Sequence, residues 1–171
     1  MEILHHPSAS IAIGEWGAPI WPSGVSGSIS HSQGKCARLV VADDATLVGI
    51  DIEKVPAGAS LQAILQEALN AEERDRIFRQ TMFDAPILAA LIFSAKETLY
   101  KALYPIVLEF LRFDAVVFNG IRGDETLSLS MVHALHDAIP RNQEILIQFE
   151  IGGEFVKTWA IIERGTLHSF R

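Results

Sequence analysis

In the stretch Leu47-Val-Gly-Ile-Asp-Ile-Glu53, β-branched residues alternate with a glycine and two carboxylates. This period of two predicts a β-strand whose apolar side chains occupy one face and whose polar side chains occupy the other. Asp51 and Glu53 then project in the same direction, with their α-carbons about 6.6 Å apart at roughly 3.3 Å of rise per residue. The two carboxylates are therefore close enough to converge on one cation, which would take oxygen ligands.

A second stretch, Phe93-Ser-Ala-Lys-Glu-Thr-Leu-Tyr-Lys-Ala-Leu103, is predicted to be helical and carries Lys96, Glu97 and Lys101. A third carboxylate flanked by two ammonium groups suits a site for a divalent cation and a phosphate, because the lysines neutralise the phosphate. Each stretch alone has an ordinary explanation. A solvated Glu97–Lys101 pair at i,i+4 spacing, for example, would be worth only about 0.3–0.5 kcal/mol.

A third motif precedes these two, namely Trp21-Pro22-x-Gly24-x-x-Gly27-Ser28-Ile29-Ser30-His31-Ser32. With Gly-Ile-Asp-Ile-Glu and Phe-Ser-x-Lys-Glu-x-x-x-Lys following it in order, the set resembles the signature of the phosphopantetheinyl transferase superfamily. The upstream motif is similar to one found in the enterobactin- and surfactin-type branch. The resemblance covers residues 17–163.

The resemblance implies transfer of the phosphopantetheine arm of coenzyme A to a serine of an acyl-, peptidyl- or aryl-carrier protein, with release of adenosine bisphosphate. It also implies that Asp51, Glu53 and Glu97 hold Mg²⁺ against the pyrophosphate. Glu97, acting directly or through a water molecule, is the family's candidate base for the serine proton.

The same resemblance assigns the cationic residues to coenzyme A. Lys101 would stabilise the transferring phosphoryl group, and Lys96 is a weaker candidate for that role. His31 would contact a phosphate of the nucleotide, because a protonated imidazole can donate from both nitrogens.

A separate cluster of His133, His136 and Asp137 imitates a metal site but lacks a fourth ligand.

The predicted fold class is α+β, with two pseudo-symmetric halves that each hold an antiparallel sheet and a packed helix. A single domain is expected over residues 1–171, with a truncated first half at 1–46 and a second half at 47–171. Gln33-Gly34 predicts a hairpin turn, and the first strands are expected to form a three-stranded antiparallel meander that brings His31 and Asp51 into one sheet. Later strands are predicted at 112–118, 126–132, 144–151 and 154–162, the last two joined by a hairpin at Gly152-Gly153.

Two short helices are predicted before the helix that carries Glu97. Ser60 is expected to cap the first, and Asn70 the second, with Glu73 completing a capping box. The charged face at 72–79 is expected to meet solvent.

The long helix is predicted to start at Asp84 and to end at Pro105, whose ring would clash with a further turn. Its Glu97 is expected on the side opposite the apolar stripe. That stripe comprises Leu88, Ile92, Ala95, Leu99 and Ala102.

The amino-acid composition argues against several classes of protein. The formal charge of −7, from 21 acidic and 14 basic residues, argues against nonspecific binding to nucleic acid or membrane surfaces. No apolar run approaches the ~20 residues of a membrane span. The first residues do not resemble a signal peptide, and the single Cys36 allows no internal disulfide, so a cytoplasmic protein is expected.

The N-terminal segment that this branch normally carries, with basic residues that grip coenzyme A, is expected to be missing, since the first 34 residues hold no Lys or Arg. Weak coenzyme A binding by the monomer and a homodimer that buries apolar surface are therefore expected. Two other functions stay open: a module that binds coenzyme A or a carrier protein with little or no transfer, and a structural subunit.

Overall fold

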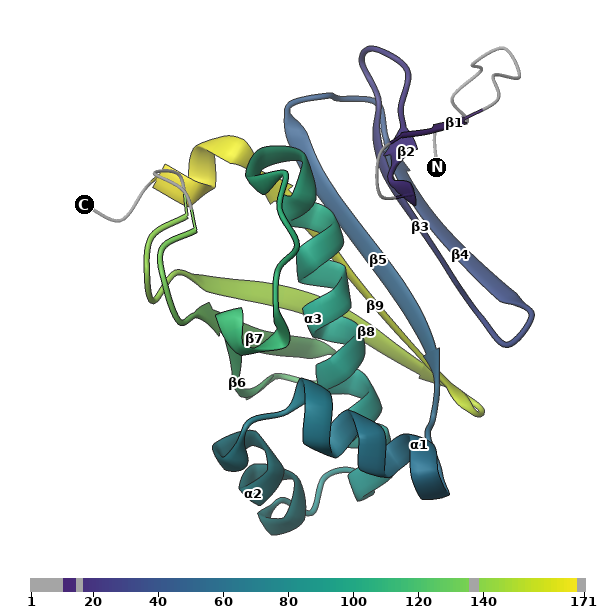
Figure 1. Ribbon diagram of the computed structural model, residues 1–171, viewed down its shortest axis with the longest axis vertical. Helices are drawn as coiled ribbons and strands as arrows, with labels where there is room; N and C mark the ends of the chain where they lie inside the picture. The colour runs from purple at the N-terminus through teal and green to yellow at the C-terminus, as the bar shows by residue number, and fades with distance from the viewer. Residues whose placement is uncertain (1–10, 15–16, 136–138, 169–171) are drawn as a thin grey trace.

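The second part of the chain forms a five-stranded antiparallel sheet, seen in a computed structural model that describes residues 11–14, 17–135 and 139–168. The strand order is β5-β9-β8-β7-β6, and the helix α3(Ala85–Val107) packs on one face, mainly over β5 and β9 (Figure 1). The strands are β5(Thr46–Lys54), β6(Val116–Arg122), β7(Thr126–Met131), β8(Glu144–Gly152) and β9(Phe155–Glu163). The predicted α+β class with antiparallel sheets is confirmed.

The apolar stripe of α3 forms the centre of the core. All five residues predicted for this stripe are at most 1% exposed. They pack against the inward residues of the sheet, including Leu127, Leu129 and Ile147. The helix begins after Asp84 as predicted, but it passes Pro105 and ends at Val107. Pro105 is tolerated because it lies in the last turn, where its missing N–H costs one helical hydrogen bond.

Two short helices pack at one end of α3 (Figure 1). The first, α1(Gly58–Ala63), continues into the π-helical turn η2(Ile64–Ala68). It starts earlier than predicted, because Ser60 accepts a hydrogen bond from the backbone N–H of Ala57 as the third helical residue rather than as the cap. The second helix, α2(Ala71–Arg79), has the predicted capping box between Asn70 and Glu73.

The first part of the chain forms two small sheets, β1(Ala12–Ile13) with β2(Pro19–Ile20), and β3(Ser26–Ser32) with β4(Lys35–Val41). The predicted turn at Gln33-Gly34 is confirmed; both residues have positive φ, at 47° and 78°. The predicted three-stranded meander is wrong, because β5 pairs with β9 and β3 meets β5 through serine side chains instead of a backbone ladder.

Three of the four strands predicted after α3 agree with the structure to within one residue at each end, and the first is displaced. A 3₁₀ turn, η3(Phe113–Ala115), delays β6 to Val116, whereas the hairpin predicted at Gly152-Gly153 joins β8 to β9 as expected. His136 and Asp137 of the second metal candidate lie outside the described residues. Among the described helices, even α3, at 23 residues, does not combine the length and apolarity of a membrane-spanning segment.

Candidate active site

Asp51 and Lys101 meet next to a close contact between β5 and α3. A Cβ built at Gly49 would lie 2.1 Å from the carbonyl oxygen of Thr98, so only glycine allows this contact between the two backbones. Asp51 follows two residues later on the same face of β5, and Lys101 follows Thr98 by almost one helical turn. The sequence thus places the carboxylate and the ammonium opposite each other.

The Asp51 carboxylate is buried and only half satisfied. Its Oδ1 atom accepts hydrogen bonds from Lys101 Nζ at 2.6 Å and from Ser30 Oγ at 2.7 Å. Its Oδ2 atom is buried and has no hydrogen-bond partner among the described residues. Because a buried charged oxygen without a partner is costly, this atom is the strongest single indication that a ligand belongs here.

Glu53 and Glu97 are half-buried and share the electrostatic field of Asp51. Burial raises the pKa of Glu97, the charge of Asp51 raises it further, and Lys101 opposes both effects. Burial and then Asp51 also raise the pKa of Glu53, against a hydrogen bond from Ser32 and the charge of Lys101. The negative charges of the three carboxylates therefore disfavour one another, and a nearby cation would stabilise the charged form of each.

The donor set fits a hard divalent cation in chemistry. Carboxylate oxygens are the ligands that Mg²⁺ prefers, and Asp51 Oδ2 is free to serve as one. Within the described part of the chain, however, no three His, Cys, Asp or Glu side chains already stand together as a ready-made metal site. The fit rests on the unpartnered oxygen and the coupled carboxylates.

Lys96 faces a different part of the molecule. Its Nζ donates to Glu73 at 2.8 Å, to the carbonyl of Ala68 at 2.9 Å and to that of Phe113 at 3.1 Å. These three acceptors use all three ammonium donors. The predicted phosphate role of Lys96 therefore does not fit the geometry, and the expectation that the whole 72–79 face meets solvent is wrong for the buried Glu73.

His31 is exposed and lies opposite Cys36 in the β3–β4 hairpin. Its neighbours Ser30 and Ser32 both point toward β5, so the alternation of a strand directs the His31 side chain to the other face. The structure does not bring His31 together with the carboxylates. Its predicted contact with a nucleotide phosphate stays a prediction.

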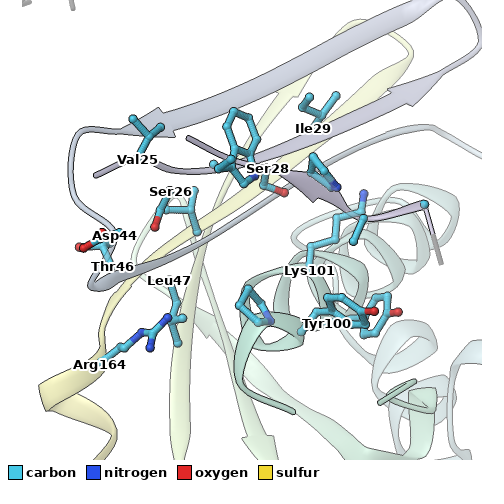
Figure 2. A pocket seen from close by; sticks show the side chains of 18 residues that line it. Val25, Ser26, Ser28, Ile29, Asp44, Thr46, Leu47, Tyr100, Lys101 and Arg164 are labelled. Atoms are coloured by element: carbon cyan, nitrogen blue, oxygen red, sulfur yellow. The ribbon is translucent and has the colours of Figure 1, made fainter. Parts of the chain in front are cut away.

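A pocket of about 410 Å³ opens beside Lys101, between β3, the start of β5 and the last turns of α3 (Figure 2). Tyr100 and Lys101 line it from the helix, and Arg164 lies at the opposite side. The ring of Trp21 would lie only 2.5 Å from a Cβ at position 27, which explains why the upstream motif needs Gly27. The remaining lining residues include Val25, Ser26, Ser28, Asp44, Thr46, Leu47, Tyr104 and Pro105.

Sequence reasoning missed Ser30 and Ser32 as neighbours of the carboxylates, and it missed the wall made by Tyr100 and Tyr104. The signals were present as serines at alternate positions of a strand and as tyrosines one helical turn apart next to Lys101. Neither pattern tells which surface it faces.

Comparisons with known proteins match both parts of the chain. Residues 47–146 match the sequence model of the 4'-phosphopantetheinyl transferase superfamily, and residues 1–41 match that of the 4'-phosphopantetheinyl transferase N-terminal domain. The 4'-phosphopantetheinyl transferase Npt of Nocardia iowensis is 36% identical over 111 residues, which are 65% of this chain and 49% of that protein. Enterobactin synthase component D of Salmonella typhimurium is 32% identical over 126 residues, 72% of this chain and 48% of that protein.

The chain thus spans about half the length of these curated relatives. A solved structure described as apo-ACPS of Chronobacterium ammoiniagenes superposes with a TM-score of 0.52 at 15% identity, covering 68% of this chain and 95% of that one. At this identity the superposition shows a shared fold alone.

Proposed function

Because the chain belongs to the 4'-phosphopantetheinyl transferase superfamily, we propose that it transfers phosphopantetheine from coenzyme A to a serine of an acyl-, peptidyl- or aryl-carrier protein. In this reaction the serine oxygen forms a bond to the phosphorus that carries the pantetheine. The bond from that phosphorus to the adenosine bisphosphate breaks, and the serine proton passes to a base. The observation that carries the proposal is Asp51, with its buried Oδ2 unpartnered and Lys101 on its Oδ1.

Each side chain of the site has a role in the proposed reaction. Asp51, Glu53 and Glu97 would hold Mg²⁺, which when bound offsets the charge of the pyrophosphate. Glu97 accepts the serine proton, directly or through a water molecule. Lys101 donates to Asp51 and to the carbonyl of Ile50, and it would direct its third donor toward the transferring phosphoryl group, since its side chain is 24% exposed and lines the pocket.

Coenzyme A would lie along the same face. The pocket beside Lys101 offers apolar walls with cationic groups at its edge, which suits a molecule that joins a ring system to phosphates. The exposed His31 remains our candidate contact for a nucleotide phosphate. Lys96 has no place in the proposed site.

The proposal extends to location and assembly. Cys36 is free and exposed, which suits a reducing compartment such as the cytoplasm. A homodimer remains a proposal. Exposed apolar side chains such as Phe78, Met82 and Phe110 are surface that a second copy would bury. Light scattering at micromolar concentration tests it, and a clean monomer would contradict it.

Mass spectrometry of an apo carrier protein after incubation with coenzyme A, Mg²⁺ and this chain tests the proposed function. We expect the mass shift of one phosphopantetheine, lost in Asp51→Asn and kept in Asp75→Asn, a matched change in the exposed α2 ion pair with Arg79. No shift with any of the three carrier classes would contradict transfer. A shift that Asp51→Asn leaves intact would contradict the site.

A further inference from the structure

Three serines at alternate positions of β3 point at β5. Ser28 Oγ accepts a hydrogen bond from the backbone N–H of Ile50 at 3.1 Å. Ser30 Oγ donates to Asp51 Oδ1 at 2.7 Å, and Ser32 Oγ donates to Glu53 Oε2 at 3.1 Å. The row therefore makes one contact to the strand backbone and two contacts to carboxylates of the proposed cation site.

The contact from Ser30 fixes how Asp51 presents its second oxygen. Oδ1 receives two donors, Ser30 from β3 and Lys101 from α3, which approach from different elements. A carboxylate held at one oxygen from two sides cannot rotate freely about its terminal bond, so the other oxygen keeps one direction. That other oxygen is the unpartnered Oδ2.

The row also joins the two regions that match family models separately. Ser30 and Ser32 lie within residues 1–41, whereas Asp51 and Glu53 lie within residues 47–146. The hairpin therefore contributes to the environment of the carboxylates and does more than pack beside β5. No backbone ladder joins β3 to β5, so the side chains of this row are what links the hairpin to the carboxylates.

We propose that Ser30 and Ser32 are positioning residues that orient Asp51 and Glu53 for a divalent cation. The inference rests on the proposed function, since it assumes that these carboxylates hold a metal. Hydrogen-bonding partners of metal ligands commonly change metal affinity by 10- to 100-fold when they are removed. If the serines had only a structural role, they would act by attaching the hairpin to β5. Ser28 separates the two explanations, because its hydrogen bond goes to the backbone N–H of Ile50 and not to a carboxylate.

Direct binding of Mn²⁺, followed by the electron paramagnetic resonance signal of the free ion without coenzyme A or carrier protein, tests the inference. We expect Ser30→Ala to weaken Mn²⁺ binding about tenfold and Ser32→Ala a few-fold, because Glu53 is only half-buried. Ser30→Thr, which keeps the hydroxyl, should restore most of the affinity. Ser28→Ala should lower the melting temperature while leaving Mn²⁺ affinity within about twofold of the unsubstituted chain.

The outcomes separate this inference from the function on which it rests. Unchanged Mn²⁺ affinity in Ser30→Ala and Ser32→Ala, with binding by the unsubstituted chain intact, overturns the positioning role alone. An equal loss in Ser28→Ala also overturns it, because the effect would then be general. No Mn²⁺ binding by the unsubstituted chain contradicts the metal site as well. If Ser30→Ala does not fold, the partly exposed Ser32→Ala carries the same test.

Discussion

The helix α3 carries two lysines five positions apart, and each pairs with a carboxylate in a different way. Lys96 lies 2.8 Å from Glu73, with side chains 2% and 0% exposed, and every donor and acceptor of this pair has a protein partner. Lys101 lies 2.6 Å from Asp51, with side chains 24% and 2% exposed, and it leaves Asp51 Oδ2 unpartnered. One pair is complete and the other is open.

The difference shows what each pair does. Glu73 also accepts from the backbone N–H groups of Asn70 and Phe118, so its pair with Lys96 joins α2, α3 and β6. Such a pair holds elements together and offers nothing to a ligand. The pair of Lys101 and Asp51 has an accessible ammonium and an unused oxygen, which are the features a substrate needs.

Glu73→Ala should lower the free energy of unfolding by about 3–5 kcal/mol, because it leaves the Lys96 ammonium buried without its countercharge. Urea denaturation measures this loss. Glu72→Ala, at the exposed neighbouring position, is the matched control and should change stability by less than about 0.5 kcal/mol. A loss below about 1 kcal/mol for Glu73→Ala would mean that the buried pair is not a structural clamp.

Asp51→Asn should show the opposite profile, with transfer reduced by about 10³-fold and the free energy of unfolding changed by about 1 kcal/mol or less. Stability changes little because the freed Lys101 can reach solvent. Rates of carrier-protein modification and urea denaturation measure the two quantities. Near-normal transfer would remove the proposed metal site.

Lys101→Ala should lower the turnover rate by about 10²-fold while changing coenzyme A affinity much less, since an ammonium directed at the transferring phosphate matters most where charge develops. Lys101→Arg should recover only part of the rate, because a planar guanidinium does not replace a compact charge. Steady-state kinetics with calorimetry of coenzyme A binding separates the effects. A raised Michaelis constant at unchanged turnover would make Lys101 a binding residue only.

For Glu97→Gln we expect a small effect on stability measured without divalent cations, and this effect should depend on pH. The folded-state pKa of Glu97 is raised above 4.5, mainly by burial and then by Asp51, so the folded protein holds this proton more tightly than the unfolded chain. Its contribution to stability is complete below pH 4.5 and is lost as the pH rises through the raised pKa. Glu97→Gln should therefore flatten this decline and gain about 0.5 kcal/mol relative to the unsubstituted chain at pH 7. Denaturation at several pH values checks it, and a steeper decline would contradict the assigned direction.

Local patterns in the sequence predicted the parts of the fold that local physics decides. The period of two located the strand with Asp51, and the three-to-four spacing of apolar residues located α3 and its buried face. The capping box at Asn70 and the turn at Gln33-Gly34 followed from residue types with few alternatives.

Contacts between distant residues decided the rest. The predicted meander placed β5 beside β4, but β5 pairs with β9, whose residues lie more than 100 positions away. Glu73 was predicted to face solvent because its partner Lys96 stands 23 positions later, and nothing in the spacing links the two. The serine row was missed for the same reason, since alternation shows that a face exists without showing what covers it.

Gly49 has a consequence for any experiment that ranks positions by lost activity. The atom it lacks would overlap the carbonyl of Thr98, so every other residue there would force β5 and α3 apart at the point from which Asp51 and Lys101 are aimed. In a saturation-mutagenesis screen scored by transfer alone, position 49 would look like a reacting residue, although it has no functional group. Only a parallel screen that measures the amount of folded protein would show that Gly49 matters because it is small enough to let β5 and α3 touch.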